Sequence, residues 1–284
     1  ETRANMALAG DADVIMNIPT PSVSRIENSG TMTVHEVINP RVHALYPDCG
    51  KPQFSDVRTR QALSLAIDRT AIARTIMRNA DLAATQLFPP VMPDWHFDDL
   101  PRYDFDVAKA EALLDEAGWT KGDDGIRSKD GVRFAGTIRT FPNRPEMPVI
   151  AAALQAMFKT IGYDLDISIG DASAIDYYGS TGTGMIAVIS SEFVVEESRS
   201  QSDTGATNWR NEEFDRLTAT YYGETDEEVR AKSRHRLAQI LQEDVPVLPI
   251  VWYSQIFAVS DRIEGFVNDP FEQRLYLDRL SFKA

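Results

Sequence analysis

The chain has 284 residues, of which 43% are hydrophobic and 25% charged, the balance of a folded protein rather than a disordered one. Its 29 Lys and Arg stand against 43 Asp and Glu, a formal net charge of −14 that argues against a nucleic-acid binder with a basic face. A single cysteine, Cys49, excludes an internal disulfide and a cysteine-based zinc cluster. The length suggests two lobes or one large α/β unit.

The termini and the apolar runs bear on localisation. No apolar run approaches the roughly 20 residues that a membrane span needs. The first ten residues lack the basic-then-apolar order of a signal peptide. Because the chain begins with Glu1 rather than Met, we expect it to be a processed product or a piece of a longer chain.

Helices are predicted where a capping residue precedes apolar residues at helical spacing. In the last of them, Thr225-x-x-Glu228 has the form of a capping box, and Pro246 ends the helix. The residues expected to begin the helices are Ser55, Asp68, Asp106 (with Gly118 as the end), Asn211 and Thr225. Residues 88–101 are predicted to form a rigid, proline-rich surface loop.

A strand–helix–strand pattern occupies residues 124–170. Asp130-Gly131 is a hairpin signal, and the alternating residues Val132–Ile138 predict the strand that follows. Apolar residues at helical spacing then run from Ile150 to Ile161, and Gly162 predicts a left-handed helix end. Residues 163–169 alternate again, which completes a βαβ unit with parallel strands. Two further strands are expected at 247–251 and 256–259.

Sequence motifs for catalysis are missing. The chain has no nucleophile elbow, no phosphate-binding loop and no zinc-protease motif. Gly182–Ala187 matches a relaxed dinucleotide pattern, but the glycines lead into a strand instead of a helix. The four scattered histidines do not have metal-ligand spacing. We therefore expect no cofactor, no metal and no catalytic residue.

The ends of parallel strands are where α/β sheets bind ligands, and they select the candidate site. Arg139 and Phe141 follow the first predicted strand, and an arginine fork suits a carboxylate. Ser190, Glu192 and Phe193 follow the third strand, where Glu192 suits an ammonium group. The alternative is that Arg139 and Glu192 are solvated rim residues. Trp95 and Trp209 also have two interpretations: each is either a core residue or an aromatic platform for a ligand.

Residues 56–69, DVRTRQALSLAIDR, resemble a signature of the extracytoplasmic solute-binding proteins of the oligopeptide, dipeptide and nickel ABC-importer family. Further segments resemble the family in the same order, so the resemblance spans essentially the whole chain. They are Phe88–Pro90 with Tyr103–Asp106 and Lys109–Trp119, then Asn208–Leu217, and Glu243–Ile250.

The resemblance implies an α/β, type II periplasmic-binding-protein-like fold, with one complete lobe of mixed sheet and flanking helices and part of a second lobe. Residues 1–45 would be the partial first lobe and a crossing strand, 54–245 the second lobe, and 246–284 the return to the first. It also implies a periplasmic, monomeric binding component without enzymatic activity. Such a protein captures a peptide or similar small solute by hinge closure of two lobes and delivers it to an ABC permease in the membrane.

One segment departs from the family pattern. Peptide binders carry a loop with an acidic residue that receives the peptide's amino terminus, and Glu192 with Phe193 stands at that place in this chain. The Trp of that loop is replaced by Ile189, so a nickel chelate or another small molecule remains an alternative ligand, and the histidine that nickel binders use is missing. The ligand-binding residues implied overall are Glu192, Phe193, Ser190, Arg139, Phe141, Trp209 and Tyr46.

Two functions of other classes compete with transport. One is a hydrolase on an α/β scaffold, but the nucleophile and metal motifs that a hydrolase needs are missing from the sequence. The other is a sensory domain that uses the same fold to gate a partner protein. If part of the first lobe lies outside this chain, about half of the ligand contacts do as well, and we expect the isolated chain to bind weakly or not at all.

Overall fold

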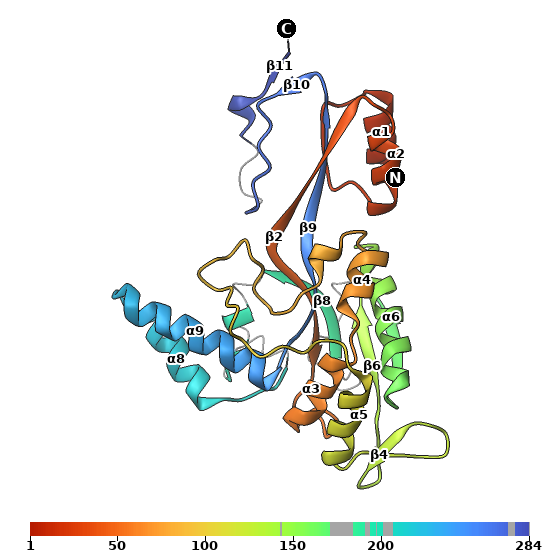
Figure 1. The fold of residues 1–284 in the computed structure, drawn as a ribbon, viewed down its shortest axis with the longest axis vertical. Helices are drawn as coiled ribbons and strands as arrows, with labels where there is room; N and C mark the ends of the chain where they lie inside the picture. The colour runs from red at the N-terminus through yellow and green to blue at the C-terminus, as the bar shows by residue number, and fades with distance from the viewer. Residues whose placement is uncertain are drawn as a thin grey trace. The chain divides into compact units, whose positions relative to one another are not determined.

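The computed structural model describes the chain except residues 143, 171–183, 191–193, 197, 201–206, 272–275 and 284, and the side chains of residues 184–190. It divides into two compact units (Figure 1). Unit 1 contains residues 1–41 and 253–284, and unit 2 contains residues 42–252. Two long strands belong to both units, β2 (Met32–Pro47) and β9 (Leu248–Ser260).

Unit 2 is built on the predicted βαβ unit. Strand β6 (Ala135–Thr140), helix α6 (Glu146–Thr160) and strand β7 (Asp164–Ile169) follow one another, and β6 and β7 pair in parallel. Strand β8 (Gly184–Ser190) pairs in parallel with the other edge of β6. The order of the mixed sheet is β1-β9-β2-β8-β6-β7. The α/β fold class and the parallel crossover are therefore confirmed.

The hairpin at Asp130-Gly131 forms as predicted, but the strand that follows it is divided. Asp130 and Gly131 have φ of 50° and 80°, and they join β4 (Arg127–Lys129) to β5 (Val132–Arg133) in a small sheet with β3 (Thr120–Lys121). Phe134 separates β5 from β6, because its N–H donates to Arg127 in the small sheet and its carbonyl accepts from Asp164 in the large one. The prediction of a single strand over 132–138 was wrong because Phe134 serves both sheets.

Aromatic side chains form the core between α6 and the two sheets. Tyr163 lies 4.5 Å from Phe134 and 5.8 Å from Phe158, measured between ring centroids. Trp119 and Phe54 also pack on Phe134, with ring centroids at 4.8 and 6.5 Å. Gly162, with φ of 82°, ends α6 as predicted, and a Cβ there would lie 2.9 Å from Arg127. Only glycine fits this close turn without displacing its neighbours.

The capping predictions hold at three helices and fail at two. Asp68 caps α4 (Arg69–Thr75), Asp106 caps α5 (Val107–Glu116) and Asn211 caps α8 (Glu212–Gly223). Helix α3 (Val57–Leu65) begins at Asp56 instead of Ser55, and α9 (Glu227–Asp244) at Asp226 instead of Thr225. In both cases the aspartate carboxylate reaches the N–H two residues on, at 2.9 Å, so it occupies the cap itself.

The arginines of the DVRTRQALSLAIDR segment bind the carboxyl ends of helices. Arg60 donates to the carbonyl of Asp244 at the end of α9 (2.8 Å), and Arg58 donates to that of Glu116 at the end of α5 (2.7 Å). Arg69 donates to the carbonyl of Ser64 near the end of α3 (2.8 Å). The last carbonyls of a helix lack intrahelical partners and carry partial negative charge, so a guanidinium satisfies both needs. The segment that resembles the family therefore builds its scaffold.

Residues 88–101 form a loop as predicted, with exposed positions such as Pro90 and Asp94, but part of this loop packs into unit 2. Phe88 and Trp95 are buried and stack at 4.8 Å, and Trp95 meets Tyr221 edge to face at 5.3 Å. Trp95 is thus a core residue in this structure. The two strands expected at 247–251 and 256–259 form one continuous strand, β9. The residues between them are extended and are buried or half-buried.

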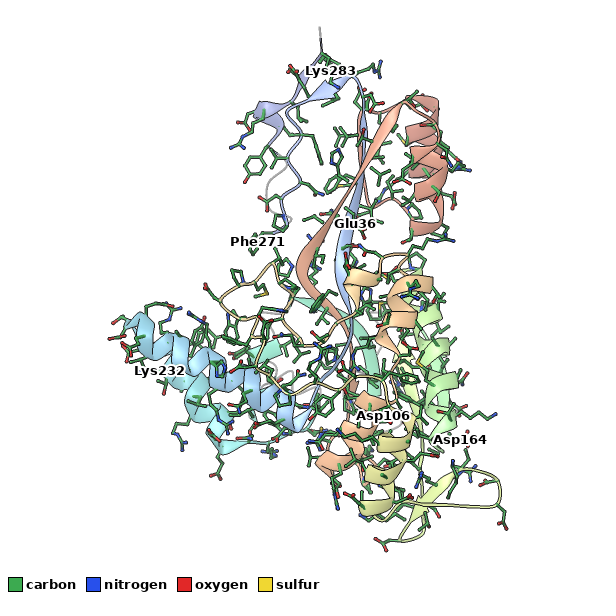
Figure 2. All side chains as sticks on the ribbon, viewed as in Figure 1. Glu36, Asp106, Asp164, Lys232, Phe271 and Lys283 are labelled. Carbon is green, nitrogen blue, oxygen red and sulfur yellow. The ribbon has the colours of Figure 1, made fainter. Side chains whose placement is uncertain are left out.

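Unit 1 has a small core. Helices α1 (Thr2–Ala9) and α2 (Val23–Glu27) lie side by side, and α1 packs on the short strand β1 (Val14–Met16), which pairs antiparallel with β9. Strands β10 (Ile263–Glu264) and β11 (Ser281–Phe282) form a separate ladder. Phe271, labelled in Figure 2, is 47% exposed. Other large apolar side chains of this unit are exposed as well, namely Met6, Met16, Leu277 and Phe282. One buried apolar cluster of this unit consists of Ala4, Ala7, Ile15, Ile18, Ile26, Met32, Ile256 and Ala258.

Candidate functional site

The carboxyl ends of the parallel strands form the candidate site in unit 2. Arg139 lies between Ser168 of β7 and Met185 of β8 in the strand register, at the centre of three parallel strands. The N–H of Gly170 donates to the carbonyl of Thr140 at 3.0 Å, so the ends of β6 and β7 meet. Arg139 is half-buried and Phe141, the next residue but one, is buried. A positive group and an aromatic ring therefore occupy the strand end where α/β proteins bind ligands.

Of the remaining predicted site residues, some lie outside the described part of the chain and the others are buried. Ser190 is the last residue of β8, and its side chain is outside the described part of the chain, as are Glu192 and Phe193. Trp209 is 7% exposed and packs edge to face on Phe214 at 5.2 Å. Tyr46, near the end of β2, is 2% exposed. Trp209 and Tyr46 are thus core side chains here, and a ligand contact by either stays a prediction.

A buried histidine and a carboxylate of the first turn of α6 form a pair that was not among the predicted site residues. His43 on β2 is completely buried, and its Nε2 lies 3.1 Å from Oε1 of Glu146 in the first turn of α6. Burial by itself raises the pKa of the Glu146 carboxyl, but the hydrogen bond and charge of His43, and more weakly the charge of Arg144, lower it below its usual value overall. Glu146 is therefore held as a carboxylate next to the strand end.

The sequence contained only part of the signal for this pair. His43 stands among the apolar residues of a crossing strand, and such a residue must find a polar partner when it is buried. Glu146 lies 103 residues away, beyond a proline-rich stretch, so no spacing rule joins the two. A polar residue in an apolar strand is detectable from sequence, but its partner is decided by the tertiary fold.

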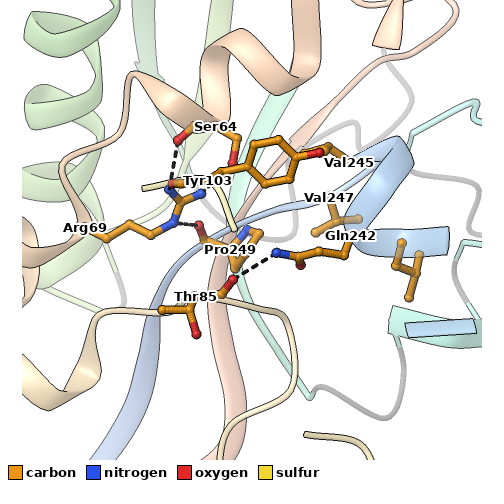
Figure 3. A pocket seen from close by; sticks show the side chains of 9 residues that line it. Ser64, Arg69, Thr85, Tyr103, Gln242, Val245, Val247 and Pro249 are labelled. Carbon is orange, nitrogen blue, oxygen red and sulfur yellow. Dashed lines mark hydrogen bonds between the residues drawn. The ribbon is translucent and has the colours of Figure 1, made fainter. Parts of the chain in front are cut away.

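A second polar site, a small cavity, lies among α3, α9 and β9 (Figure 3). Its volume is about 10 Å³, roughly the space that one water requires. Arg69 faces it and donates to the carbonyls of Pro249 (2.8 Å) and Tyr103 (3.1 Å) and to the hydroxyl of Ser64 (2.7 Å). Burial lowers the pKa of Arg69 to about 10, opposed by Asp104. The bonds to carbonyls indicate a structural role rather than a ligand site.

The described residues contain no group of three or more His, Cys, Asp or Glu side chains placed to hold a metal ion. Cys49 is buried, and burial is the main cause that raises the pKa of its thiol to about 11, so it is a weak nucleophile. Among the helices described, none is both long and apolar enough to cross a bilayer.

Comparison with known proteins relates this geometry to a family. The family model described as bacterial extracellular solute-binding proteins, family 5 Middle, matches residues 1–222, which is more than half of the chain. The chain belongs to this family. The oligopeptide-binding protein AppA of Bacillus subtilis is 25% identical over 233 residues, covering 76% of this chain and 42% of AppA. The dipeptide-binding protein of Escherichia coli is 26% identical over 274 residues, covering 90% of this chain and 49% of that protein.

Solved structures agree on the fold. The structure of Bacillus subtilis AppA in complex with a nonapeptide matches with a TM-score of 0.84 and 22% identity, covering all of this chain and 58% of AppA. NikZ from Campylobacter jejuni in complex with Ni(L-His) matches with a TM-score of 0.82 and 20% identity, covering 98% of this chain and 59% of NikZ. The fold is type II periplasmic-binding-protein-like, as expected. The chain spans about half the length of the curated relatives it matches.

Proposed function

We propose that this chain is part of the substrate-binding component of an ABC importer, which captures a peptide or similar small solute and delivers it to a membrane permease. The observation that carries the proposal is the family match over residues 1–222. The names of the relatives, oligopeptide-binding and dipeptide-binding proteins, support a peptide ligand. The relatives are binding proteins and not enzymes, which supports a function without catalysis.

The proposed ligand contacts follow from charge. Arg139 would hold the carboxylate of the ligand with its guanidinium, because this fork matches the two carboxylate oxygens. Glu192 would receive the amine, and the aromatic rings of Phe141 and Phe193 would pack on the peptide. Ser190, Tyr46 and Trp209 complete the proposed set.

The proposal extends to the setting of the protein. Units 1 and 2 would correspond to the two lobes of a periplasmic binding protein. The protein would be extracytoplasmic and monomeric, and it would not bind nucleic acid, for which its net charge of −14 is unsuited. Closure of two lobes around the ligand, the mode implied by the resemblance, belongs to the same proposal.

The test is a thermal-unfolding screen of the chain, alone and within the full translated product of its gene, against a dipeptide, its N-acetyl form and its C-terminal amide. A ligand at a hundredfold excess over its dissociation constant stabilises the folded state by about 2.7 kcal/mol, which raises the midpoint by about 5 °C or more. We expect the dipeptide to raise the midpoint and each blocked form to lose most of the effect.

Variants of Glu192 and Arg139 test which side chain binds the amine of the dipeptide and which binds its carboxylate. Glu192→Ala is expected to abolish the response to the dipeptide and to change nothing further for the N-acetyl form, and Arg139→Met to behave in the same way toward the amide. The matched control is Glu196→Ala, which removes a carboxylate that pairs with Arg199 at 2.6 Å and should leave binding intact. A midpoint raised only by nickel with histidine or citrate would move the protein to the chelate-binding alternative, and no response to any ligand from a folded full-length protein would refute transport.

A further inference from the structure

The small sheet of unit 2 carries two Asp-Gly pairs, Asp124-Gly125 before β4 and Asp130-Gly131 between β4 and β5. Both aspartates and Gly131 are exposed, and the sheet lies at the periphery of unit 2 (Figure 1). In an Asp-Gly pair the backbone nitrogen of the glycine can attack the preceding side-chain carboxyl, because glycine has no Cβ that hinders ring closure. The two pairs have the same sequence, so their surroundings decide which of them reacts.

The contacts of Asp124 oppose this reaction. Its Oδ2 accepts a hydrogen bond from Arg133 at 2.6 Å, and its Oδ1 accepts one from the N–H of Ile126 at 3.0 Å. The hydrogen bond from Arg133, followed by that from Ile126, keeps the pKa of the Asp124 carboxyl below its usual value, so the protonated form that can lose water is scarce. The attacking nitrogen is bound as well, because the N–H of Gly125 donates to the carbonyl of Gly122 at 3.0 Å.

The turn at Asp130-Gly131 lacks such contacts. Among the described residues, none donates a hydrogen bond to the Asp130 carboxylate or pairs with its charge, and none accepts from the N–H of Gly131. A Cβ built on Gly131 would meet no atom within 4 Å, so there is space for a ring and for water. Strands β4 and β5 on either side have only three and two residues, so opening the turn costs little.

The reaction is a cyclisation followed by hydrolysis. The nitrogen of Gly131 forms a bond to Cγ of Asp130, and its proton leaves with the carboxyl hydroxyl as one molecule of water. Water then adds to one of the two carbonyls of this succinimide and reopens the ring. Addition at the main-chain carbonyl gives isoaspartate, in which the backbone runs through Cβ and Cγ and is one atom longer. The lengthened turn disturbs the pairing of Lys129 with Val132.

We propose that Asp130-Gly131 is a site of spontaneous isoaspartate formation and that the contacts of Asp124 protect Asp124-Gly125 from the same modification. The inference is independent of the proposed function, since it concerns only the small sheet and requires water as the sole co-reactant. Its physical basis is the difference in bonding between two chemically identical pairs.

The test incubates the folded chain in water enriched in the heavy isotope of oxygen and then digests it with trypsin in ordinary water. Each cycle of ring closure and hydrolysis introduces one heavy oxygen, and isoaspartyl methyltransferase detects the isoaspartate itself. Cleavage after Arg127 separates the two pairs into different peptides. We expect both signals to accumulate at Asp130 at least about fivefold faster than at Asp124, because the reaction at Asp124 first has to break its hydrogen bonds.

Unfolding and variants separate the effect of structure from that of local sequence. In urea the contacts of Asp124 are lost, and the two rates should become similar. Arg133→Met, which also removes a pair with Asp164 at 3.2 Å, should speed modification at Asp124 by about threefold in the folded chain. Arg102→Met, the matched control, removes an exposed arginine elsewhere and should leave both rates unchanged.

A further variant checks that the signal arises from the carboxyl of Asp130. Asp130→Ser removes this carboxyl and should abolish both signals in the peptide that contains residue 130. Equal rates at the two pairs in the folded chain, a difference of the same size in urea, or an unchanged rate at Asp124 in Arg133→Met would each overturn the inference.

Discussion

Arg69 is one of the buried arginines of unit 2, and its charge has to be stabilised in the interior. It is 8% exposed, and its guanidinium donates to three carbonyls and one hydroxyl without a carboxylate among these partners. The negative end of α3 helps to stabilise the charge, since one acceptor is the carbonyl of Ser64. The charge is retained in the interior because Ser64, Tyr103 and Pro249, from three different segments of the chain, all supply acceptors to the guanidinium.

Removal of this side chain is therefore costly. We expect Arg69→Met to lower the free energy of unfolding by about 3 kcal/mol or more, because two buried carbonyls and one part-buried carbonyl lose their donor. Denaturant unfolding followed by circular dichroism measures the effect. The matched control is Arg102→Met, which breaks an exposed pair with Asp104 at 2.8 Å and should cost less than about 1 kcal/mol. Equal costs for the two variants would show that the buried bonds are not decisive.

Two adjacent residues, Thr225 and Asp226, could each cap the amino-terminal end of helix α9. Thr225 and Asp226 are both good capping residues, and the Thr225-x-x-Glu228 pattern favours the first. In the structure the N–H groups of Thr225 and Asp226 both donate to Glu224, at 2.7 and 2.9 Å. Because Glu224 binds these two N–H groups, the helix begins one residue later than the pattern predicts. The carboxylate of Asp226 then accepts from the N–H groups of Glu228 and Val229.

The two candidates for the cap of α9 are distinguished by alanine. We expect Asp226→Ala to lower the free energy of unfolding by about 1 kcal/mol, because two N–H groups lose their acceptor. Thr225→Ala should change it by less than about 0.5 kcal/mol, the range of surface substitutions away from special features. Urea unfolding curves of both variants measure the difference. A larger loss from Thr225→Ala than from Asp226→Ala would restore the capping box.

At the scale of the whole molecule, the two units differ in how much they bury. Among the described residues of unit 1, the buried cluster around Ile15 and Ile26 has eight members, three of them alanine, and β1 has only three residues. Unit 2 has aromatic residues packed between its helices and sheets, and the buried Arg60 and Arg69, with the half-buried Arg58, bind the ends of three helices. A small core supplies little free energy against the entropy of the chain.

Hydrogen exchange measures this difference. We expect amides of α1 and β1 in unit 1 to exchange at least about tenfold faster than those of α3 and β6 in unit 2, because local opening costs less where few apolar contacts are lost. Mass spectrometry of peptic peptides under native conditions reports both sets in one experiment. The peptides of β10 and β11 serve as an internal reference for a short, exposed ladder. Equal protection of α1 and α3 would contradict the expectation.

The sequence by itself determined the local structure where one residue decides the backbone. Asp130-Gly131 and Gly162 lie at turns with positive φ, and Asp68, Asp106 and Asn211 supply the cap from their own side chains. It also determined the βαβ unit, because periodicities of two and 3.6 residues reflect burial on one face. From these, and from the segments that resemble the family, the fold class and Arg139 at the end of β6 followed.

Only the tertiary structure decided which distant groups meet. Phe134 divides a strand because two sheets share it, Trp95 is buried because Phe88 and Tyr221 cover it, and His43 pairs with Glu146 across 103 residues. The physical reason is the same in each case. A buried polar group or ring is stable only with its partner, and that partner is brought into reach by the packing of the whole unit rather than by spacing along the chain.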